Sequence, residues 1–496
     1  MSIKSLFGGT QKKRSFISRR DFLFEAGGGI SGVALAQLLA SEGLLATHPN
    51  AIDQCADISD LPSPLTVKPA HYQPRVKAVI SLFMSGGVSH VDTFDPKPDL
   101  TKYHGSTLEG KGRIRVRQGY PGPLMKSPFQ FKKYGQSGIE VSELFPNVGE
   151  MVDDIVFIRS ATGRSNDHIL AHYEWNTGMQ ILGFPSVGSW VTYGLGSENQ
   201  NLPGFVVIYD ERGGPFSGSN NWSNGFLPGA YQGTVFRSTG DPILDLRPPS
   251  SVTQERQRSR LDHLGMLNEE HAKQHPGSTE LAARIASYEL AYRMQSCAPE
   301  AVDLSKENES TTQLYGMDKP ETKSFGRQCL LARRLVERGV RFVQLYNGAD
   351  AGQNINNWDA HSNLVENHTL HAREVDKPIA GLLKDLKQRG LLDETLVIWH
   401  SEFGRMPISQ RGVGRDHNPG AMTMWMAGGN IQGGQVVGST DEVGYKAAEQ
   451  IVTYHDVHAT ILHMLGIDHT SLTYFFNGRH HRLTDVHGEL IPQIAG

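Results

Sequence analysis

Six short apolar runs, each ending at glycines or polar residues, constrain the fold of this 496-residue chain more than any other feature. They lie in the segments VKAVISLFMSGG, DDIVFIRSAT, LPGFVVIYD, GVRFVQLYNG, DETLVIWHSEFG and MTMWMAGG. Runs that are short and apolar throughout are typical of strands buried on both faces of a sheet. Helical patterns separate several of them, and two of these patterns end at glycines, Gly339 and Gly390. The alternation predicts an α/β fold with a doubly wound, mostly parallel central sheet and helices on both faces.

The hydrophobic content is sufficient for one large core or two domains. The net charge does not indicate a strongly charged partner. The chain is 38% hydrophobic and carries a net charge of −4. A charge this small produces no overall field that attracts nucleic acid, so we expect no nucleic-acid partner. The three cysteines lie far apart and show no metal-binding or disulfide spacing.

The first 50 residues run from a basic segment into a mildly apolar one. SRRDFL, at residues 18–23, resembles a twin-arginine export signal, although an ordinary basic amphipathic helix is the alternative. We therefore predict a signal peptide over 1–50, a proline-rich linker over 51–75 and the α/β domain over 76–496. The signal implies the export machinery as a partner and a periplasmic or extracellular location.

Residues from about 210 to 300 differ from the alternating pattern. A glycine-rich stretch is followed there by a charged segment with helical periodicity. We predict an insertion on the core that acts as a lid or a substrate-shaping subdomain, with its charges on a solvated helix face.

Four polar clusters follow predicted strands, at the sheet edge where α/β folds place their sites. The first contains Ser85, Ser89, His90, Asp92 and Asp95, and the second Asp167, His168 and His172. The third contains Asp359, His361 and His368, and the fourth His400, Glu402, Arg405, Arg415, Asp416 and His417. We expect the functional residues to belong to these clusters.

Two of the clusters suggest metal ligands. In an extended WDAH segment, Asp359 and His361 point the same way and form half of a metal site; a turn with an incidental histidine is the alternative. His417 belongs to a predicted polar loop, GRDHNPG, where a core role is not expected. Glu402 follows a central strand, so it must be paired, bound to metal or placed in a cleft. Arg405 is either its ion-pair partner or a group that binds an anionic substrate.

Other candidates have a structural alternative. His168 and His172 share one helix face, which suits either proton transfer or a scaffold. Asp92 is a candidate metal ligand, or forms a turn before Pro96. The histidines near the C-terminus are interpreted as scaffold, with His455 as a residue of the site's rim.

Several motifs resemble the domain of unknown function 1501 family, which is sulfatase-like and belongs to the alkaline phosphatase superfamily. Beyond the export signal, they are ISLFMSGGVSHVDTFDPKP, FPSVGSWVTYGLG, LPGFVVI, WDAH, SEFGR and GRDHNPGAMTMWMAGG, in order over roughly residues 70–490. The resemblance implies the alkaline phosphatase/sulfatase-like version of the predicted fold.

The resemblance also implies a metal site. Asp359 and His361 look like the superfamily's Asp–His pair, and His417 looks like its last histidine. Glu402 stands where a metal-ligating aspartate is expected, while Phe403 replaces the histidine that follows it. These positions make Asp359, His361, Glu402 and His417 the expected ligands of one metal.

A second metal site and the nucleophile stay open. The superfamily expects an aspartate directly after the first strand, where this chain has MSGG and only later Asp92. The position of the modified sulfatase nucleophile falls on His168, and no cysteine lies near it. A metal-bound water, His168 and Ser165 are the alternatives, and a degenerate, inactive site also fits.

In an active site of this type, a divalent metal polarises the ester oxygen and lowers the pKa of a bound water. Arg405 or Arg415 is expected to bind the anionic oxygens, and His168 or His172 to transfer a proton. Zinc suits the ligands best, with calcium or manganese as alternatives.

We therefore predict an exported, metal-dependent hydrolase of sulfuric or phosphoric esters that acts on a small-molecule or saccharide ester. The first alternative is a non-catalytic anion- or glycan-binding protein on a degenerate sulfatase-like core. The second is a different metal enzyme on this scaffold.

Overall fold

The computed structural model describes residues 65–110, 114, 116–117, 121–243, 246, 252–274, 279–350 and 356–496. The predicted twin-arginine signal lies outside these residues. Within the described ranges, no helix combines the length and the apolar character that crossing a membrane requires.

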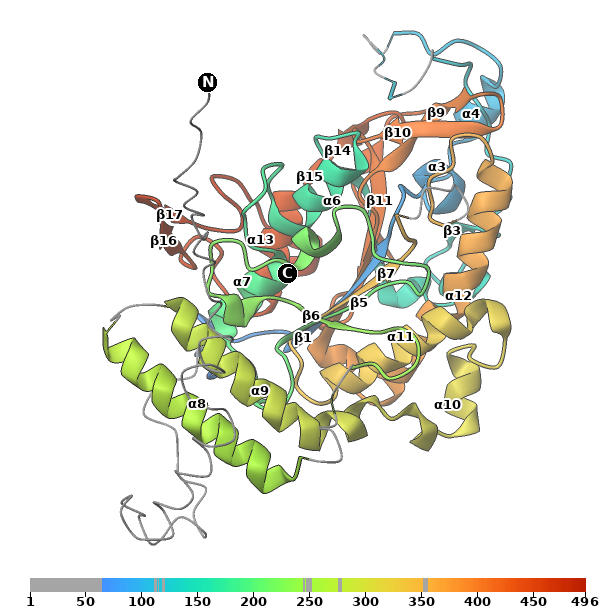
Figure 1. Cartoon of the computed structure of the whole chain (residues 1–496). Helices are drawn as coiled ribbons and strands as arrows, with labels where there is room; N and C mark the ends of the chain where they lie inside the picture. The colour runs from blue at the N-terminus through green and yellow to red at the C-terminus, as the bar shows by residue number, and fades with distance from the viewer. Residues whose placement is uncertain are drawn as a thin grey trace, which may run out of the picture. The chain divides into compact units, whose positions relative to one another are not determined.

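A nine-stranded sheet forms the centre of the described chain (Figure 1). Its order is β12-β4-β11-β8-β1-β7-β5-β6, with β15 also paired to β4. β11 is antiparallel to β4 and β8, and the remaining pairs are parallel. The strands are β1 (Ala78–Met84), β4 (Ile155–Thr162), β5 (Phe205–Ile208), β6 (Thr234–Phe236), β7 (Phe342–Asn347), β8 (Thr395–His400), β11 (Met422–Ala427), β12 (Gln435–Val437) and β15 (Val452–Thr453). All six apolar runs are strands of this sheet, which confirms the predicted mostly parallel architecture.

Both faces of the sheet are covered by helices, as the alternation of β1 side chains shows. Ile80 and Leu82 join one buried cluster with residues of α11 (Pro320–Val336) and α12 (Leu364–Gln388). Val79 and Phe83 join a second cluster with residues of α6 (His168–Thr177), α7 (Val187–Leu195) and α13 (Tyr454–Met464). Side chains of alternate strand residues point to opposite faces, so one strand contributes to both cores.

The other helices and strands are short or lie outside the sheet. They are α3 (His90–Thr93), α4 (Pro98–Lys102), β2 (Phe131–Tyr134), β3 (Ile139–Ser142), α5 (Pro146–Gly149), α8 (Gln254–Gln274), α9 (Thr279–Val302), α10 (Glu309–Leu314), β9 (Gly404–Gln410), β10 (Gly414–Asn418), β13 (Ser439–Thr440), β14 (Ala447–Glu449), β16 (Tyr474–Phe476), β17 (Arg479–His481) and α14 (Pro492–Ala495).

The segment predicted as an insertion has two parts. β6 pairs with β5 and so belongs to the central sheet. The charged part forms α8 and α9, which lie side by side and are joined by an ion pair from Arg258 to Glu289 at 2.9 Å (Figure 1). A lid or substrate-shaping role for this helix pair stays a prediction.

The prediction of a polar loop at GRDHNPG is wrong, because residues 414–418 form the buried strand β10. It pairs with β9 in an antiparallel hairpin that places His417 opposite Arg405. The sequence of this segment is polar and does not indicate a buried strand. The strand can be buried because residues elsewhere in the fold compensate its charges, as Asp92 does for Arg415.

A buried ion pair fixes this hairpin to α3. Arg415 donates from Nε and Nη2 to the two carboxylate oxygens of Asp92, at 2.6 and 3.2 Å, and neither side chain is exposed. The hydroxyl of Ser89 donates to the same carboxylate at 2.5 Å. Burial alone would raise the pKa of Asp92, but the guanidinium and these hydrogen bonds hold the pKa below its ordinary value. Asp92 is therefore ionised in the folded protein.

We predict that Asp92→Asn lowers the free energy of unfolding by about 3–5 kcal/mol, because it leaves the buried Arg415 charge uncompensated. Urea denaturation at neutral pH measures the loss. Since the folded pKa is depressed, the wild-type contribution is full above the ordinary carboxyl pKa of about 3.9 and is lost as pH falls below it. Asp262→Asn, which removes a surface partner of Arg258, is the control and should change stability little. Equal losses in both variants would contradict a structural role for the buried pair.

Candidate metal centre

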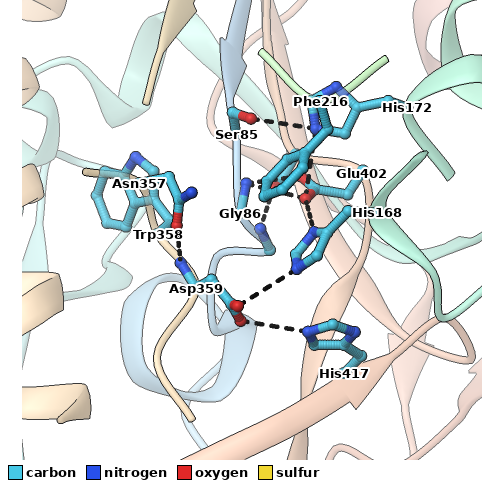
Figure 2. Close-up of polar contacts among 12 residues, drawn as sticks. Ser85, Gly86, His168, His172, Phe216, Asn357, Trp358, Asp359, Glu402 and His417 are labelled. Carbon is cyan, nitrogen blue, oxygen red and sulfur yellow. Dashed lines mark hydrogen bonds and ion pairs between the residues drawn. The ribbon is translucent and has the colours of Figure 1, made fainter. Parts of the chain in front are cut away.

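The candidate ligands come from segments that meet at the carboxyl edge of the sheet (Figure 2). His168 is the first residue of α6, after its N-cap Asp167. Asp359 follows β7, Glu402 lies just past β8, and His417 is on β10. The topology therefore collects residues that are far apart in the sequence.

Asp359 is the centre of the cluster. One carboxylate oxygen lies 3.0 Å from Nε2 of His361 and 3.2 Å from Nε2 of His417, and the other lies 3.5 Å from Nε2 of His168. Nη2 of Arg405 donates to Asp359 at 2.6 Å. Burial alone would raise the pKa of this carboxyl, but Arg405 and the histidines hold the pKa far below its ordinary range. The carboxylate is therefore ionised.

Each of the three imidazoles turns its other nitrogen, Nδ1, toward an oxygen outside the cluster. For His168 this is a carboxylate oxygen of Glu402 at 2.6 Å, and for His417 the carbonyl oxygen of Asn166 at 2.7 Å. For His361 it is the side-chain oxygen of Gln410. A carbonyl or carboxylate oxygen can only accept, so these contacts place the proton on Nδ1.

This tautomer leaves an Nε2 lone pair facing Asp359 wherever the imidazole is neutral. Burial lowers the pKa of His417 to about 4, so this ring is neutral at pH 7. Its lone pair then faces a carboxylate, and two acceptors at 3.2 Å repel each other unless a cation lies between them. Histidine ligands of metals usually have this arrangement, with the outer N–H donated to a carboxylate or carbonyl.

The donor set fits zinc. Nε2 of three imidazoles and a carboxylate are ligands that zinc prefers, and bonds of about 2.0–2.1 Å in a tetrahedron put neighbouring ligand atoms about 3.3 Å apart. His361 and His417 lie 3.0 and 3.2 Å from one oxygen of Asp359, close to this value, while His168 lies 3.5 Å from the other oxygen. Among the described residues, two groups offer ligand atoms that all lie within 4.8 Å of one another: His168, Asp359 and His417, and His361, Asp416 and His417.

Glu402 occupies a different position from the predicted ligand, because it contacts the cluster through His168. It is fully buried, and it accepts from the backbone N–H of Gly86 at 2.9 and 3.1 Å and from the hydroxyl of Ser401 at 2.8 Å (Figure 2). Burial alone would raise its pKa, but the charge of His172 and the hydrogen bond from His168 hold the pKa well below its ordinary value. The sequence left open whether Glu402 forms an ion pair, binds a metal or lies in a cleft. In the structure its carboxylate contacts and orients His168.

His168 is held on its other side by aromatic rings. Its ring stacks on Phe216 with centroids 4.3 Å apart and an interplanar angle of 7°. Its pKa is raised: burial would lower it, but the hydrogen bonds with Asp359 and Glu402 outweigh burial. Between two carboxylates, His168 therefore carries either a second proton or a metal.

Phe403, at the position where the sequence resemblance implied a histidine, packs against the same group. Its ring centroid lies 4.5 Å from that of His417 and 5.0 Å from that of His168. It therefore contributes an apolar wall to the cluster.

The structure gives no support to four of the predicted roles. Arg405 is fully buried and donates to Asp359 and to the carbonyl oxygens of Gly87 and Arg415, so it is not open to an anionic substrate. Arg415 and Asp92 are occupied by each other, so an anion at one or a metal at the other would have to break their buried pair. The partner of Arg405 is also Asp359 rather than the predicted Glu402.

His172 lies behind Glu402 and away from Asp359. Its Nε2 is 3.4 Å from the Glu402 carboxylate and 3.1 Å from the Ser85 hydroxyl, and all three side chains are fully buried. The i,i+4 spacing correctly indicated that His168 and His172 share a helix, but only His168 reaches the cluster. A catalytic role for His172 stays a prediction that this position does not favour.

Two parts of the site had no signal in the sequence. Phe216 belongs to the glycine-rich stretch, where nothing marks it as a partner of His168. The carbonyl of Asn166 and the side chain of Gln410 fix the histidine tautomers, yet neither belongs to a recognisable motif.

Comparison with known proteins identifies the family. Residues 76–495 match the model of the protein family of unknown function DUF1501, so the chain belongs to this family, as its motifs suggested. No curated protein sequence matches the chain.

Solved structures of sulfatases and phosphatases are similar at low identity. A sulfatase from Pseudoalteromonas sp., PsFucS1, is 12% identical, with a TM-score of 0.33 over 80% of this chain and 68% of that one. The alkaline phosphatase from the Antarctic bacterium TAB5 is 11% identical, with a TM-score of 0.32 over 75% and 96%. The lipoteichoic acid synthase LtaP from Listeria monocytogenes is 7% identical, with a TM-score of 0.35 over 81% and 76%.

We predict that Gly86→Ala disturbs the centre more than an alanine at a comparable glycine elsewhere. Gly86 has φ +120°, and a Cβ there would lie 2.5 Å from the backbone N of Trp358 and 2.6 Å from that of Asp359. The backbone that carries Asp359 is fixed by the contacts of this carboxylate and cannot shift without cost, so the free energy of unfolding should fall by about 2 kcal/mol or more. Gly105→Ala is the matched control, since Gly105 has φ +85° but no atom within 4 Å of a Cβ. Thermal or urea unfolding compares the two; equal losses would show that the close approach of Gly86 to Asp359 is not a constraint.

Proposed function

We propose that this protein is a divalent-metal-dependent hydrolase of sulfuric or phosphoric esters. The observation that carries the proposal is the inward orientation of the imidazole nitrogens of His168, His361 and His417 around the Asp359 carboxylate. The ester class follows from the motifs shared with the alkaline phosphatase superfamily. Export through the predicted signal and a small-molecule or saccharide ester as substrate are parts of the same proposal.

The chain's own residues prepare the site in distinct ways. Asp359, His361, His417 and His168 would hold the cation, zinc being the best fit. A bound divalent cation polarises the ester oxygen and lowers the pKa of a water molecule. Glu402 holds the proton of His168 on Nδ1, and Arg405 offsets part of the Asp359 charge, which limits the affinity of the carboxylate for a cation. Phe403 and Phe216 restrict access of water to the rings of His168 and His417.

One observation favours the alternative of a non-catalytic anion- or glycan-binding protein on a degenerate core. The contact of Arg405 with Asp359 already compensates the buried carboxylate without a metal. In that case His168 is an imidazolium between Asp359 and Glu402, and the cluster is a closed network of ion pairs. The two functions differ in whether metal is bound and whether esters are hydrolysed.

The proposal predicts hydrolysis of an aryl sulfate or an aryl phosphate by the purified protein. We expect the activity to disappear with a chelator and to return when zinc, manganese or calcium is added. Asp359→Asn should lower kcat/KM by about 100-fold or more, because a metal ligand and its charge are lost.

Asp393→Asn, at an exposed position before β8, serves as the control and should leave the rate unchanged. Turnover that survives the chelator, or that is the same in both variants, would contradict the metal mechanism. Absence of turnover on either ester class, with every metal, would favour the binding-protein alternative.

A further inference from the structure

A separate cavity of about 630 Å³ lies beside the candidate metal centre. Its walls are the loop after β4, the start of α13 and the C-terminal residues 469–489, and none of the four candidate ligands lines it. Tyr454 separates the two sites, because it lines the cavity while its hydroxyl donates to the backbone carbonyl of Glu402. A volume of this size is in the range of small-molecule sites.

The two partly or fully buried acids in the wall are already compensated within the protein. Glu174 accepts from Nε of Arg164 at 2.5 Å and from Gln180 at 2.8 Å. Asp456 caps α13 and accepts from the backbone N–H groups of Thr453 and Glu489, both at 2.7 Å. The negative charges of Glu174 and Asp456 are therefore compensated without a positively charged ligand in the cavity.

The basic side chains Arg482, His469 and His455 of the wall form fewer hydrogen bonds and ion pairs within the protein than these acids do. Arg482 forms no ion pair among the residues that the structure describes, and its Nε donates to the carbonyl oxygen of Asp485. His469 contacts the Thr484 hydroxyl through Nδ1 at 2.9 Å. His455 is 6% exposed, and its buried Nε2 lies beside Gly178, whose backbone acts as a hydrogen-bond acceptor and offsets part of the lowering of the ring's pKa that burial causes.

The cavity wall carries charges of both signs, with Glu174, Asp456 and Glu489 against Arg164 and Arg482. Glu174 and Asp456 are compensated as described and Glu489 is exposed, so Arg482 is the guanidinium of the wall that remains without an ion pair among the described residues. Burial lowers the pKa of His455, and the charge of Arg164 lowers it further. Burial and the charge of Arg482 do the same for His469. An anion beside these groups would gain charge-assisted hydrogen bonds, which are among the stronger polar contacts in proteins.

We propose that this cavity binds a small ligand that carries an oxyanion group (a carboxylate, sulfate or phosphate), held by the guanidinium of Arg482 and the imidazoles of His455 and His469. The site does not depend on the proposed hydrolase activity. It assigns a binding function to His455, which the sequence indicated only as a rim residue.

Isothermal titration calorimetry of the full chain with sodium glucuronate, sodium sulfate and sodium phosphate tests the proposal. A chelator in the buffer keeps the metal centre empty, so that the two sites are separated. We expect one of the three anions to bind once per chain. Arg482→Gln and His469→Gln should each weaken binding by roughly tenfold or more, while Arg482→Lys, which keeps the charge, should lose less.

Two controls make the result specific. Arg260→Gln removes an exposed arginine of α8, outside the cavity, and should bind as the wild type does. His417→Ala alters the metal centre and should also keep the binding. Unchanged melting temperatures verify that the variants are folded. The proposal is overturned if none of the three anions binds, if Arg482→Gln and His469→Gln bind like wild type, or if His417→Ala alone abolishes binding.

Discussion

The interaction on which the candidate site depends is the burial of the Asp359 carboxylate among Arg405 and three imidazoles. A charge removed from water must be compensated, and here one guanidinium and three ring nitrogens converge on it. The three rings cannot all donate to Asp359 while their outer nitrogens also donate to Glu402, Asn166 and Gln410, unless each ring is protonated. Three neighbouring imidazolium ions would repel one another, and for this reason we propose a divalent cation between the rings and Asp359.

The architecture of the sheet explains why these groups meet. Asp359 follows β7 and Glu402 follows β8, and both strands flank β1, whose end supplies the backbone N–H of Gly86 to Glu402. The β9–β10 hairpin adds Arg405 and His417, which lie directly opposite each other on the two paired strands. The buried pair of Asp92 and Arg415 fixes that hairpin to α3, so residues predicted to bind metal and substrate instead hold the hairpin that carries the candidate ligand His417.

The strands were predictable because their burial on two faces imposes continuous apolar runs, a local property of the sequence. The shared helix of His168 and His172 was predictable from spacing, and the motifs correctly indicated the family. The partner of Arg405 was not predictable, because it depends on how β9 and β10 pair and on where the segment after β7 returns. Likewise, the role of Glu402 depends on which nitrogen of His168 faces it, and Phe216 reaches the site from a stretch without any pattern. Domain boundaries and export stay predictions from the sequence.

Metal affinity tests the central claim most directly. Metal-free protein is titrated with zinc by calorimetry, for the wild type, His417→Ala, Glu402→Gln and the exposed control Glu150→Gln, and the metal content is verified by mass spectrometry. The account predicts one zinc per chain in the wild type and in Glu150→Gln, and loss of stoichiometric binding in His417→Ala. Glu402→Gln should bind one zinc with about 10- to 100-fold lower affinity, because Glu402 orients a ligand rather than binding the metal. Absence of zinc, manganese and calcium binding in the wild type would contradict the account, as would a Glu402→Gln variant that binds no metal at all.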